Sequence, residues 1–552
     1  MSERVPPERA TVGDVVAAFL ERCGVQTAFG VISIHNMPML DAVSRRGRIR
    51  FVPSRGEAGA LAMADAYARV AGGLGVAVTS TGTGAANAAG AQVEAQTAGT
   101  PLLHLTGQIE RAFLDRGRGY IHEARDQLGM LRAISKRAFR VWSPETALGT
   151  LKEAVRTALS APRGPVSVEI PIDVQEAELP WPHDLEPLTV PVAEPSAAAL
   201  DGLADALAGT RRPLLWLGGG ARDAGAAALR LVERGFGAVT SVQGRGVIPE
   251  DHPMSLGAFN GSPPVEQFYR TCDALLVVGS RLRGNETLKY ALALPQPLYQ
   301  IDAAPEADGR AYETARFVAG DAALALDGLA DRLAGKKAPD PRFHADLATA
   351  RAAAEAALRH NIAPYDRLVE ALQAVPRDFV WVRDVTVSNS TWGNRQPRLL
   401  GPRDGVHALG GGIGLGLPMA IGAALAARGR KTVALVGDGG LMLNLGELAT
   451  AVQERADLVL LVMNDRGYGV IRNIQDARYQ GRRCYADLHT PDLAALARGF
   501  GVAYRRLTEL ESAGAALRAA LEAPGPAIVE IDMTAIGPFA AAFAGPPVRQ
   551  PG

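Results

Sequence analysis

The chain alternates short, uninterrupted apolar runs with longer segments whose apolar residues recur at helical spacing. Four apolar runs occur in the first third of the chain, at residues 50–53, 75–79, 101–106 and 166–170. Three segments with the helical pattern lie among them, at 11–23, 57–70 and 87–98. Runs that are apolar on both faces are typical of parallel strands, and their alternation with helices predicts an α/β fold. Thr11 is the predicted N-cap of the first helix.

The same alternation continues in the middle of the chain. Apolar runs at 212–217 and 274–278 are each followed by glycine, and a third run, at 298–302, ends in Asp302. The first of them closes in Gly218-Gly219-Gly220. A nucleotide-binding turn and an ordinary tight turn between strand and helix both fit this triplet, and the ordinary turn is the simpler interpretation.

Two stretches have the composition of linkers. One is Trp181–Ser196, rich in proline and polar residues, and the other is Lys336–Arg342. A chain of 552 residues is too long for one ordinary core. We therefore expect three doubly wound parallel-sheet domains of the α/β class, at residues 1–180, 197–335 and 360–552.

The third block contains a diverged copy of part of the first. Residues 75–107 follow the order strand, glycine-threonine loop, helix and strand, and residues 431–465 repeat that order with a Gly-Asp-Gly-Gly loop. Only the second copy carries an aspartate in its loop. One copy is therefore predicted to hold the metal-phosphate end of a ligand, and the other its opposite end.

Polar side chains close two successive apolar runs in this second copy. Gly437, Asp438 and Gly439 follow the run 431–436, and Asn464-Asp465 follows the run 459–463, with one helix expected between them. Mg²⁺ prefers oxygen ligands and usually binds through one or two carboxylates together with phosphate oxygens. The glycines allow backbone N–H groups to approach anionic oxygens. The pattern predicts a magnesium-phosphate site.

Bulk composition narrows the classes of partner and compartment. The 58 basic and 58 acidic residues cancel, which gives no support for nucleic acid or an anionic membrane as a partner. Three widely spaced cysteines without a CxxC pair suit a reduced cytoplasm. The first 24 residues carry charges throughout, unlike a signal peptide, and no uncharged apolar stretch of about 18 residues is present.

Five motifs in order resemble the thiamine diphosphate enzymes of the acetolactate synthase, pyruvate decarboxylase and benzoylformate decarboxylase superfamily. They are FVPSRGEAGALAMADAYAR, TSTGTGAAN, HLTGQIE, GGGIGLGLPMAIGAALA and GDGG followed by MNDRGYG. The resemblance covers nearly the whole chain. It implies a pyrimidine-binding, a central and a diphosphate-binding domain. It also implies active sites between the first domain of one chain and the third of another, hence a homodimer or a dimer of dimers.

The resemblance assigns cofactor and metal positions residue by residue. Asp438 and Asp465 are the implied side-chain ligands of Mg²⁺, and Gly467 the implied carbonyl ligand. Many relatives carry asparagine where Asp465 stands, so its extra negative charge requires compensation by N–H groups or a basic side chain. A turn residue that caps Arg466-Gly467 is the alternative interpretation of Asp465. The implied cofactor-binding positions of this half also include Ser388, Asn389, Gly437, Gly439, Gly440 and Tyr468.

The catalytic residue implied by the resemblance is Glu57. In the family a carboxyl group at this position hydrogen-bonds N1′ of the aminopyrimidine ring. Gly411 is the implied acceptor for the 4′-amino group, and Ile413 the bulky residue that bends the cofactor. A glutamate stabilised by the N-terminus of its helix is the alternative for Glu57, and a core isoleucine the alternative for Ile413.

The implied substrate-facing residues depart from those of the relatives. His35 matches a histidine position of benzaldehyde lyase, and Gln108 matches an active-site glutamine of acetolactate synthases. His122 stands where relatives often have glutamine. Ile34 and Ile471 stand where pyruvate decarboxylases carry acids. Loss of both acids favours carboligation or lyase chemistry, although either histidine can also be an ordinary loop residue.

The resemblance thus implies a thiamine diphosphate- and Mg²⁺-dependent enzyme that makes or breaks a C–C bond in small carbonyl compounds. A 2-oxo acid is the expected donor, as in acetolactate synthases. Alternatives are an acyloin lyase, a 2-hydroxyacyl-CoA lyase and, in a different class, a catalytically silent paralogue that only binds the cofactor. FAD is not expected, because residues 279–290 lack the arginine-aspartate pattern of flavin-binding relatives.

Overall fold

The computed structural model describes residues 8–335 and 338–545 of the chain. The chain forms two compact units. The first comprises residues 1–191, 408–429 and 443–457, and the second comprises the remaining segments. Segments of the third sequence block therefore belong to both units. In the described part of the chain, no helix is long and apolar enough to span a membrane.

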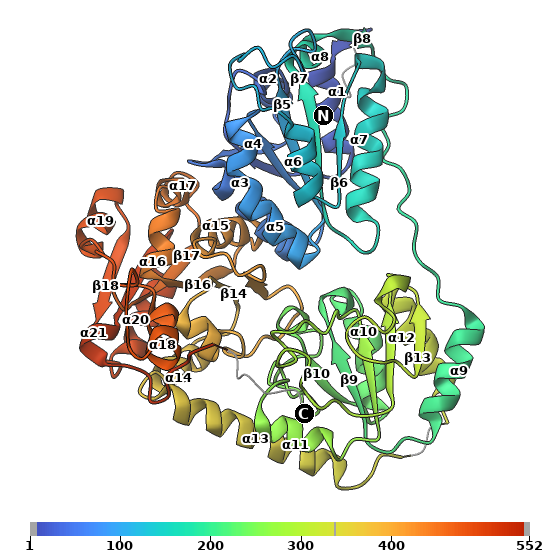
Figure 1. Ribbon diagram of the computed structural model, residues 1–552, viewed down its shortest axis with the longest axis vertical. Coiled ribbons are helices and arrows are strands. Elements are labelled where there is room, and N and C mark those ends of the chain that lie inside the picture. Colours follow the sequence, from blue (N-terminus) through green and yellow to red (C-terminus); the bar gives the residue numbers. More distant parts are fainter. Residues whose placement is uncertain (1–7, 336–337, 546–552) are drawn as a thin grey trace. The chain divides into compact units, whose positions relative to one another are not determined.

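The first unit is built on a six-stranded parallel sheet, visible in the blue part of Figure 1. The strand order is β3 (Arg50–Pro53), β2 (Thr27–Gly30), β4 (Gly75–Thr79), β5 (Leu102–Gln108), β7 (Pro165–Pro171), β6 (Arg137–Arg140). A short antiparallel pair, β1 (Arg9–Thr11) and β8 (Glu178–Pro180), lies outside it. The runs predicted at 50–53 and 75–79 are confirmed as β3 and β4. The other two are confirmed as β5 and β7, each slightly longer than predicted.

Helices cover the sheet of the first unit. One set consists of α1 (Val12–Arg22), α2 (Met37–Arg46), α7 (Pro144–Leu159) and α8 (Ile172–Glu176). A second set consists of α3 (Glu57–Ala71), α4 (Thr83–Asn87), α5 (Ala89–Ala98) and α6 (Gln127–Ile134). The predicted N-cap is confirmed: Thr11 and Asp14 form a reciprocal capping box at the start of α1. The single helix predicted at 87–98 is wrong at its start, because α4 ends at Asn87 and a new helix begins at Ala89.

Two helices from the third sequence block pack in this first unit. They are α15 (Gly416–Ala426) and α17 (Glu447–Gln453). Helix α15 lies directly against α3. Gly422 makes this approach possible, since a Cβ there would stand 2.1 Å from the carbonyl oxygen of Met63. The long α3–α15 contact thus depends on a position without a side chain.

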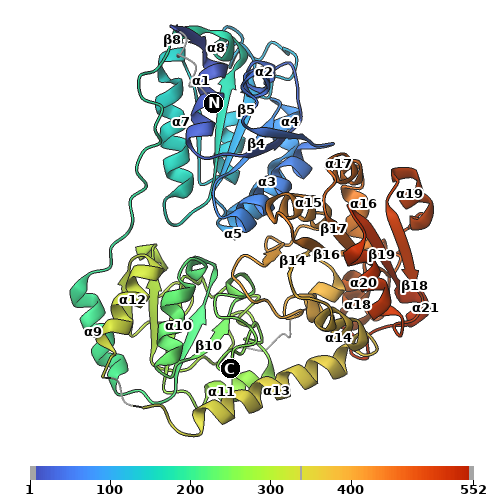
Figure 2. The ribbon, with the colours of Figure 1, turned by 180° about the vertical axis from the view of Figure 1, so that it is seen from behind.

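The second unit contains a five-stranded parallel sheet in the central part of the chain. Its order is β10 (Gly237–Thr240), β9 (Pro213–Leu217), β11 (Ala274–Val278), β12 (Leu298–Asp302), β13 (Arg316–Ala319). Buried apolar residues on one face come mainly from α9 (Ala197–Ala208), α10 (Gly225–Glu233) and α12 (Ala322–Arg332). Those on the other face come from α11 (Pro263–Tyr269) and α13 (Phe343–Ile362), as Figure 2 helps to follow. Short 3₁₀ turns lie at Gly219–Ala221 (η1), Val242–Gly244 (η2) and Pro305–Ala307 (η3).

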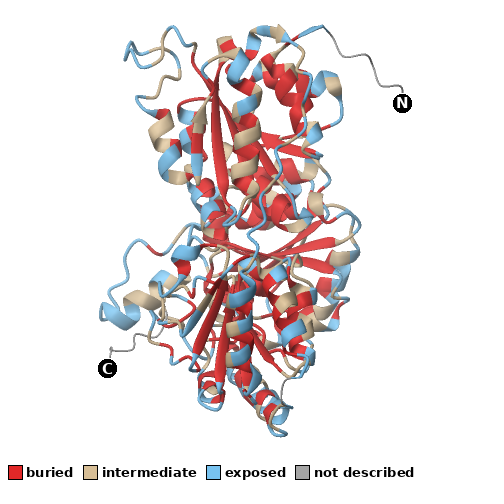
Figure 3. Cartoon of the chain, turned by 90° about the vertical axis from the view of Figure 1, so that its right-hand side faces the viewer, coloured by how far each residue is buried: buried red, intermediate tan, exposed pale blue. Residues whose placement is uncertain are grey.

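A further six-stranded parallel sheet belongs to the second unit. Its order is β15 (Gly405–His407), β14 (Phe379–Arg383), β16 (Lys431–Gly437), β17 (Leu458–Asn464), β19 (Ala527–Asp532), β18 (Ala503–Leu507). Its remaining elements are α14 (Asp366–Ala374), the π-helix η4 (Asn389–Gly393), α16 (Asp438–Leu443), α18 (Gly469–Arg478), α19 (Leu493–Phe500), α20 (Ala513–Glu522) and α21 (Met533–Ile536). Figure 3 shows that the strands are the most continuously buried elements.

The internal repeat predicted from the sequence is confirmed by topology. Numbered along the chain within each sheet, both six-stranded sheets have the strand order 2-1-3-4-6-5. Two details of the prediction at 431–465 are wrong. Asp438 is the first residue of helix α16 rather than part of a loop, and two helices, α16 and α17, separate β16 from β17. The linker predicted at 181–196 has no regular element, while Lys336 and Lys337 of the second linker lie outside the described residues.

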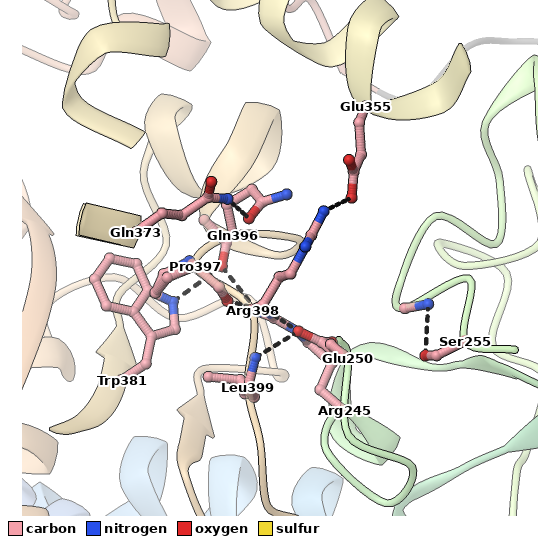
Figure 4. Close-up of polar contacts among 12 residues, drawn as sticks. Arg245, Glu250, Ser255, Glu355, Gln373, Trp381, Gln396, Pro397, Arg398 and Leu399 are labelled. Carbon is pink, nitrogen blue, oxygen red and sulfur yellow. Dashed lines mark hydrogen bonds and ion pairs between the residues drawn. The ribbon is translucent and has the colours of Figure 1, made fainter. Parts of the chain in front are cut away.

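A buried ion pair joins distant segments within the second unit (Figure 4). The Arg245 guanidinium donates to both carboxylate oxygens of Glu250, at 2.7 Å each. Glu250 also accepts the backbone N–H of Leu399 at 2.7 Å, and Arg245 donates to the carbonyl oxygen of Pro397. Arg398 pairs with Glu355 of α13 at 2.7 Å. Removing one partner of such a buried pair typically costs about 3–5 kcal/mol, so this network fixes the 397–399 segment firmly.

His104 makes the stability of the first unit depend on pH. It is fully buried on β5, with Nε2 2.9 Å from the Thr79 hydroxyl and Nδ1 3.2 Å from the Ser167 hydroxyl. Burial lowers the pKa of His104 to about 4. An unfolded chain binds this proton near pH 6.5, so the free energy of unfolding falls as the pH drops from about 6.5 to about 4 and levels off below that.

We expect His104→Gln to weaken this pH dependence. Between pH 7 and pH 5 the wild-type protein should lose about 2 kcal/mol more unfolding free energy than the variant, at about 1.4 kcal/mol per pKa unit. Urea denaturation at pH 7 and at pH 5 measures the two unfolding free energies, and hydrogen exchange of the β5 amides gives the local readout. His183→Gln is the matched control, because His183 is exposed. Parallel pH profiles for His104→Gln and wild type would show that His104 does not carry the effect.

Candidate active site

The residues expected to bind metal and diphosphate lie in the second unit, at the carboxyl ends of β14, β16 and β17. These three strands are neighbours in one parallel sheet, so their ends meet at one edge. Asp438 follows β16 directly and is 1% exposed. Its Oδ2 accepts a hydrogen bond from the Thr490 hydroxyl at 2.5 Å. Its Oδ1 is buried and has no hydrogen-bond partner among the residues that the structure describes. A buried carboxylate oxygen without a partner is costly unless a cation or donor meets it.

Asp465 lies beside Asp438 and shares its electrostatic environment. Burial, together with the negative charge of Asp438, raises the pKa of Asp465 to about 6, while Arg472 opposes the rise. The Arg472 guanidinium stands 3.0 Å from the Asp465 carboxylate and donates to its backbone carbonyl at 2.7 Å. Arg472 is therefore a basic side chain of the kind that the extra carboxylate requires. Gly469 leaves room for this carboxylate, since a Cβ there would stand 2.0 Å from Oδ2.

This arrangement fits a magnesium ion that is completed by phosphate oxygens. In the described parts of the chain, no group of three or more His, Cys, Asp and Glu side chains could enclose a metal. A pair of carboxylates with one free oxygen is instead the usual protein share of a Mg²⁺-phosphate site. Gly467 lies in the same turn, held by a bridge to Asp487, and the Tyr468 ring packs over Gly439. The structure places Gly437, Gly439 and Gly440 at the junction of β16 and α16.

Ser388 and Asn389 add two more unsatisfied polar atoms at this sheet edge. They follow β14 at the start of η4. The Ser388 hydroxyl and the Asn389 Oδ1 are buried, and neither has a hydrogen-bond partner within the described residues. Buried polar atoms in proteins are normally hydrogen-bonded, so these two unpartnered atoms indicate a position where a bound ligand would supply the partner. π-Helices are also frequent at functional sites.

The residues expected to act on the aminopyrimidine lie in the first unit. Glu57 is the first residue of α3, preceded by the glycine N-cap Gly56. Its Oε2 accepts a hydrogen bond from the Asn87 amide at 3.2 Å. A Cβ at Gly84 would stand 3.0 Å from its Oε1, so the glycine loop 80–84 lies against this carboxylate. Glu57 is half-buried, which leaves it able to meet a ligand.

Gly411 and Ile413 lie on an exposed loop that leads into α15, in the same unit as Glu57. Gly411 has φ +84°, a backbone conformation that favours glycine. Ile413 is 36% exposed, unlike a core isoleucine. The Asn444 amide donates to the carbonyl oxygen of Gly414 at 2.7 Å and fixes the end of the loop.

The two predicted histidines form a pair. The Nδ1 atoms of His35 and His122 are 3.2 Å apart, and the rings meet edge to face with centroids 5.1 Å apart. Glycines make this approach possible: the His35 backbone packs on Gly107, and the His122 carbonyl packs on Gly82. Burial lowers the pKa of His35, and the neighbouring His122 lowers it further. One proton between the two Nδ1 atoms therefore satisfies both rings.

Two further predicted substrate-facing residues, Gln108 and Ile471, belong to different units of the chain. The Gln108 side chain is 2% exposed, accepts from the Thr81 hydroxyl at 3.0 Å and donates to Glu169 at 3.3 Å. These bonds hold it inside the first unit. Ile471 lies on α18 of the second unit and is 44% exposed.

Three family models, each for a different part of the chain, match this sequence. The family models described as thiamine pyrophosphate enzyme, N-terminal TPP binding domain, central domain, and C-terminal TPP binding domain match residues 10–130, 200–329 and 386–531. A probable 2-ketoarginine decarboxylase of Pseudomonas aeruginosa is 33% identical over 546 residues, covering 95% of this chain and 94% of that protein. The chain belongs to the thiamine pyrophosphate enzyme family.

Other relatives in this family are acetolactate synthases. The large subunit of acetolactate synthase isozyme 1 of Escherichia coli is 28% identical, over 96% of this chain and 95% of that protein. A probable acetolactate synthase 2 of rice chloroplasts is also 28% identical, over 96% of this chain and 84% of that protein. The chain is therefore a thiamine diphosphate-dependent enzyme of the transferase or lyase kind, since thiamine pyrophosphate and thiamine diphosphate are one compound.

Sequence reasoning missed several side chains that support the candidate site residues in each unit. Thr490 and Arg472 support the two aspartates, and Asn87 supports Glu57. Asn87 closes the TSTGTGAAN motif, so its position in the motif could have indicated it. Thr490 lies 52 residues after Asp438, and nothing in the local sequence around it indicates this contact.

We expect Asp438→Ala to remove magnesium binding from this thiamine pyrophosphate enzyme. Loss of an outer partner of a metal ligand typically costs 10- to 100-fold in affinity, so loss of the ligand itself should cost more than about 100-fold. Calorimetric titration of Mg²⁺ with inorganic pyrophosphate measures this affinity. Asp378→Ala is the matched control, because Asp378 pairs with Arg430 on the surface. Wild-type affinity in Asp438→Ala would contradict the metal assignment.

Proposed function

We propose that the protein is a Mg²⁺- and thiamine diphosphate-dependent enzyme that decarboxylates a 2-oxo acid and joins the acyl group to a second carbonyl compound. The observation that carries the cofactor assignment is the unpartnered, buried Oδ1 of Asp438 beside Asp465. The unpartnered atoms of Ser388 and Asn389 support it. In this proposal Asp438, Asp465 and the carbonyl of Gly467 hold the metal.

The proposed roles of Glu57, Gly411 and Ile413 follow from their positions in the first unit. The Glu57 carboxyl group hydrogen-bonds N1′ of the aminopyrimidine, and the carbonyl of Gly411 accepts from the 4′-amino group. Ile413, exposed on its loop, offers an apolar surface to the ring. When bound, thiamine diphosphate supplies the electron sink for a carbanion next to a carbonyl. The protein supplies orientation and the hydrogen bonds that fix the ring's protonation state.

The His35–His122 pair is the proposed proton carrier toward the substrate. The two rings share one Nδ1–Nδ1 hydrogen bond, and burial disfavours a lasting charge on His35. A proton that enters at the Nε2 of one ring is therefore relayed through the shared hydrogen bond and leaves from the Nε2 of the other ring, so that both rings end neutral. Ile34 and Ile471 are apolar and exposed at positions where the resemblance places acids in aldehyde-releasing decarboxylases. This combination favours transfer of the acyl group over release of an aldehyde.

Simple decarboxylation is the second candidate. It is favoured by the likeness to the protein named a probable 2-ketoarginine decarboxylase, with which this chain aligns nearly end to end. The two candidates share the cofactor, the metal and a 2-oxo acid donor. They differ in whether the acyl group leaves as an aldehyde or joins a second carbonyl.

One incubation series separates the candidates. The protein, loaded with Mg²⁺ and thiamine diphosphate, is incubated separately with pyruvate, benzoylformate, glyoxylate, 2-ketoarginine and benzoin. Mass spectrometry of the products identifies ligated hydroxyketones, free aldehydes or cleaved benzoin. Ligated products support the proposal, aldehydes alone favour the decarboxylase, and benzoin cleavage alone favours an acyloin lyase. Cofactor binding without turnover of any of these substrates would favour the silent paralogue.

We expect Glu57→Gln to keep the cofactor and lose the reaction. General acid–base groups contribute about 10²- to 10⁴-fold in rate, and glutamine cannot supply the carboxyl proton. Product formation should fall by that factor, while calorimetric affinity for thiamine diphosphate with Mg²⁺ changes much less. Glu153→Gln, on α7 and paired with Arg137 and Arg156, is the control. A rate near that of wild type in Glu57→Gln would exclude Glu57 as the activating acid.

We further propose a homodimer in which two chains complete each site. If this is so, Glu57→Gln and Asp438→Ala chains, each inactive alone, should regain activity when co-expressed with different affinity tags and purified as a mixed dimer. Each mixed dimer then holds one site with both substitutions and one site with neither, so about half of the wild-type rate is expected. No recovery in a verified mixed dimer would show that each site is formed within one chain.

A further inference from the structure

A buried carboxylate in the first unit holds the backbone of the loop that carries Gly411 and Ile413. Glu94, on α5, is 2% exposed. Its Oε1 accepts the N–H of Leu409 at 2.7 Å, and its Oε2 accepts the N–H of Gly410 at 2.6 Å. Each carboxylate oxygen therefore bonds one of two successive peptide groups. Hydrogen bonds from N–H groups to a carboxylate are about twice as strong as neutral ones.

Buried charges behind Glu94 hold its carboxylate in place. Arg69, from α3, donates to Glu94 at 3.2 Å and to both oxygens of Asp65. All three side chains are at most 2% exposed. One cation thus serves two carboxylates, and Thr100 adds hydrogen bonds to Arg69 and Asp65. The peptide N–H groups of residues 409 and 410 add two hydrogen bonds to Glu94. Without these two N–H groups, the buried Glu94 carboxylate would lose two charge-assisted hydrogen bonds.

A second buried carboxylate makes the reciprocal contact at Glu57. Glu447, on α17, is 2% exposed and accepts the N–H groups of Arg55 and Gly56 at 3.0 Å each through Oε1. Its Oε2 accepts from the Thr450 hydroxyl at 2.6 Å. Gly59 admits this carboxylate, since a Cβ there would stand 2.1 Å from Oε1. The residue after Gly56 is Glu57.

Each of the two carboxylates holds a segment from the other sequence block. Glu94 comes from the first sequence block and holds a loop of the third block, whereas Glu447 comes from the third block and holds a turn of the first. The far end of the loop that Glu94 holds is fixed by the Asn444–Gly414 hydrogen bond. Residues 410–413 are exposed, and a Cβ at Gly411 would meet nothing within 4 Å. Fixing a free backbone costs roughly 1–2 kcal/mol per residue, so an unclamped loop would pay that cost on binding a ligand.

We propose that Glu94 and Glu447 are positioning residues that clamp the Gly411–Ile413 loop and the Glu57 turn, so that both are preorganised for the aminopyrimidine ring of thiamine diphosphate. This inference rests on the proposed function. The clamps act through backbone N–H groups and touch neither cofactor nor substrate. Their effect is therefore confined to the aminopyrimidine end of the cofactor and leaves the magnesium-diphosphate end unchanged.

Glu94→Gln tests the first clamp. Glutamine accepts one N–H but presents its own NH₂ group to the other, so one of the two contacts is lost. We expect the affinity for thiamine diphosphate with Mg²⁺ to fall about tenfold, the usual effect of losing one hydrogen bond to a charged group. The affinity for Mg²⁺ with inorganic pyrophosphate, which lacks the aminopyrimidine, should stay at the wild-type value. In the apoprotein, the amides of Leu409 and Gly410 should exchange with deuterium faster.

Two further variants keep the test independent of folding. Gly410→Ala leaves every charge in place but brings a Cβ to 2.9 Å from the Glu94 Oε2, which displaces the clamp, and it should reproduce the selective loss. Glu447→Gln should do the same at the Glu57 turn, with faster exchange at Arg55 and Gly56. Glu178→Gln, whose partner Arg9 is on the surface, is the matched control and should match wild type throughout.

The outcomes separate the clamp from the function on which it rests. Equal weakening of thiamine diphosphate and pyrophosphate in Glu94→Gln would indicate a general structural role and overturn the proposal. Wild-type affinity for thiamine diphosphate in both Glu94→Gln and Gly410→Ala would also overturn it. Failure of the wild-type protein itself to bind thiamine diphosphate would instead remove the proposed function, and the clamps' role with it.

Discussion

Two carboxylates at the ends of neighbouring buried strands create the constraint on which the proposed metal site in the second unit depends. Asp438 and Asp465 follow β16 and β17, which pair in parallel from residue 432 onward, so both side chains arrive at one edge of the sheet. Burial and mutual repulsion raise the pKa of Asp465. Arg472 offsets part of the charge, but the Asp438 Oδ1 still has no partner among the described residues. A divalent cation relieves both penalties at once.

Duplication of one six-stranded sheet explains why each unit carries its own set of candidate site residues, with different chemistry in each. Both copies have the same strand order, and in both the polar residues collect where parallel strands end. The copy in the second unit uses its strand ends for carboxylates and unpartnered oxygens. The copy in the first unit instead carries Glu57 at a helix start and the His35–His122 pair beside glycines. Glycines at 82, 84 and 107 let the backbone approach these side chains closely.

In the first unit, two buried carboxylates hold backbone segments in place. Glu94 and Glu447 each accept two backbone N–H groups from a segment distant in the sequence. Such contacts fix a backbone without occupying the surface that a ligand would meet. The α3–α15 packing brings these segments together, and it requires glycine at position 422.

The sequence by itself determined the fold class, the strands and the family, because apolar runs and glycine-rich motifs depend on local order. The strands at 50–53, 75–79, 274–278 and 298–302 coincide with their predicted bounds, and the internal repeat predicts a shared topology. Only the tertiary structure decided which side chains support the site. Thr490 reaches Asp438 across 52 residues and Glu94 reaches Leu409 across 315, and no periodicity encodes such contacts. The start of α16 at Asp438 was also decided by tertiary structure. Glycine has a low helix propensity, so the local sequence Gly-Asp-Gly-Gly predicts a turn, and tertiary packing overrides that preference.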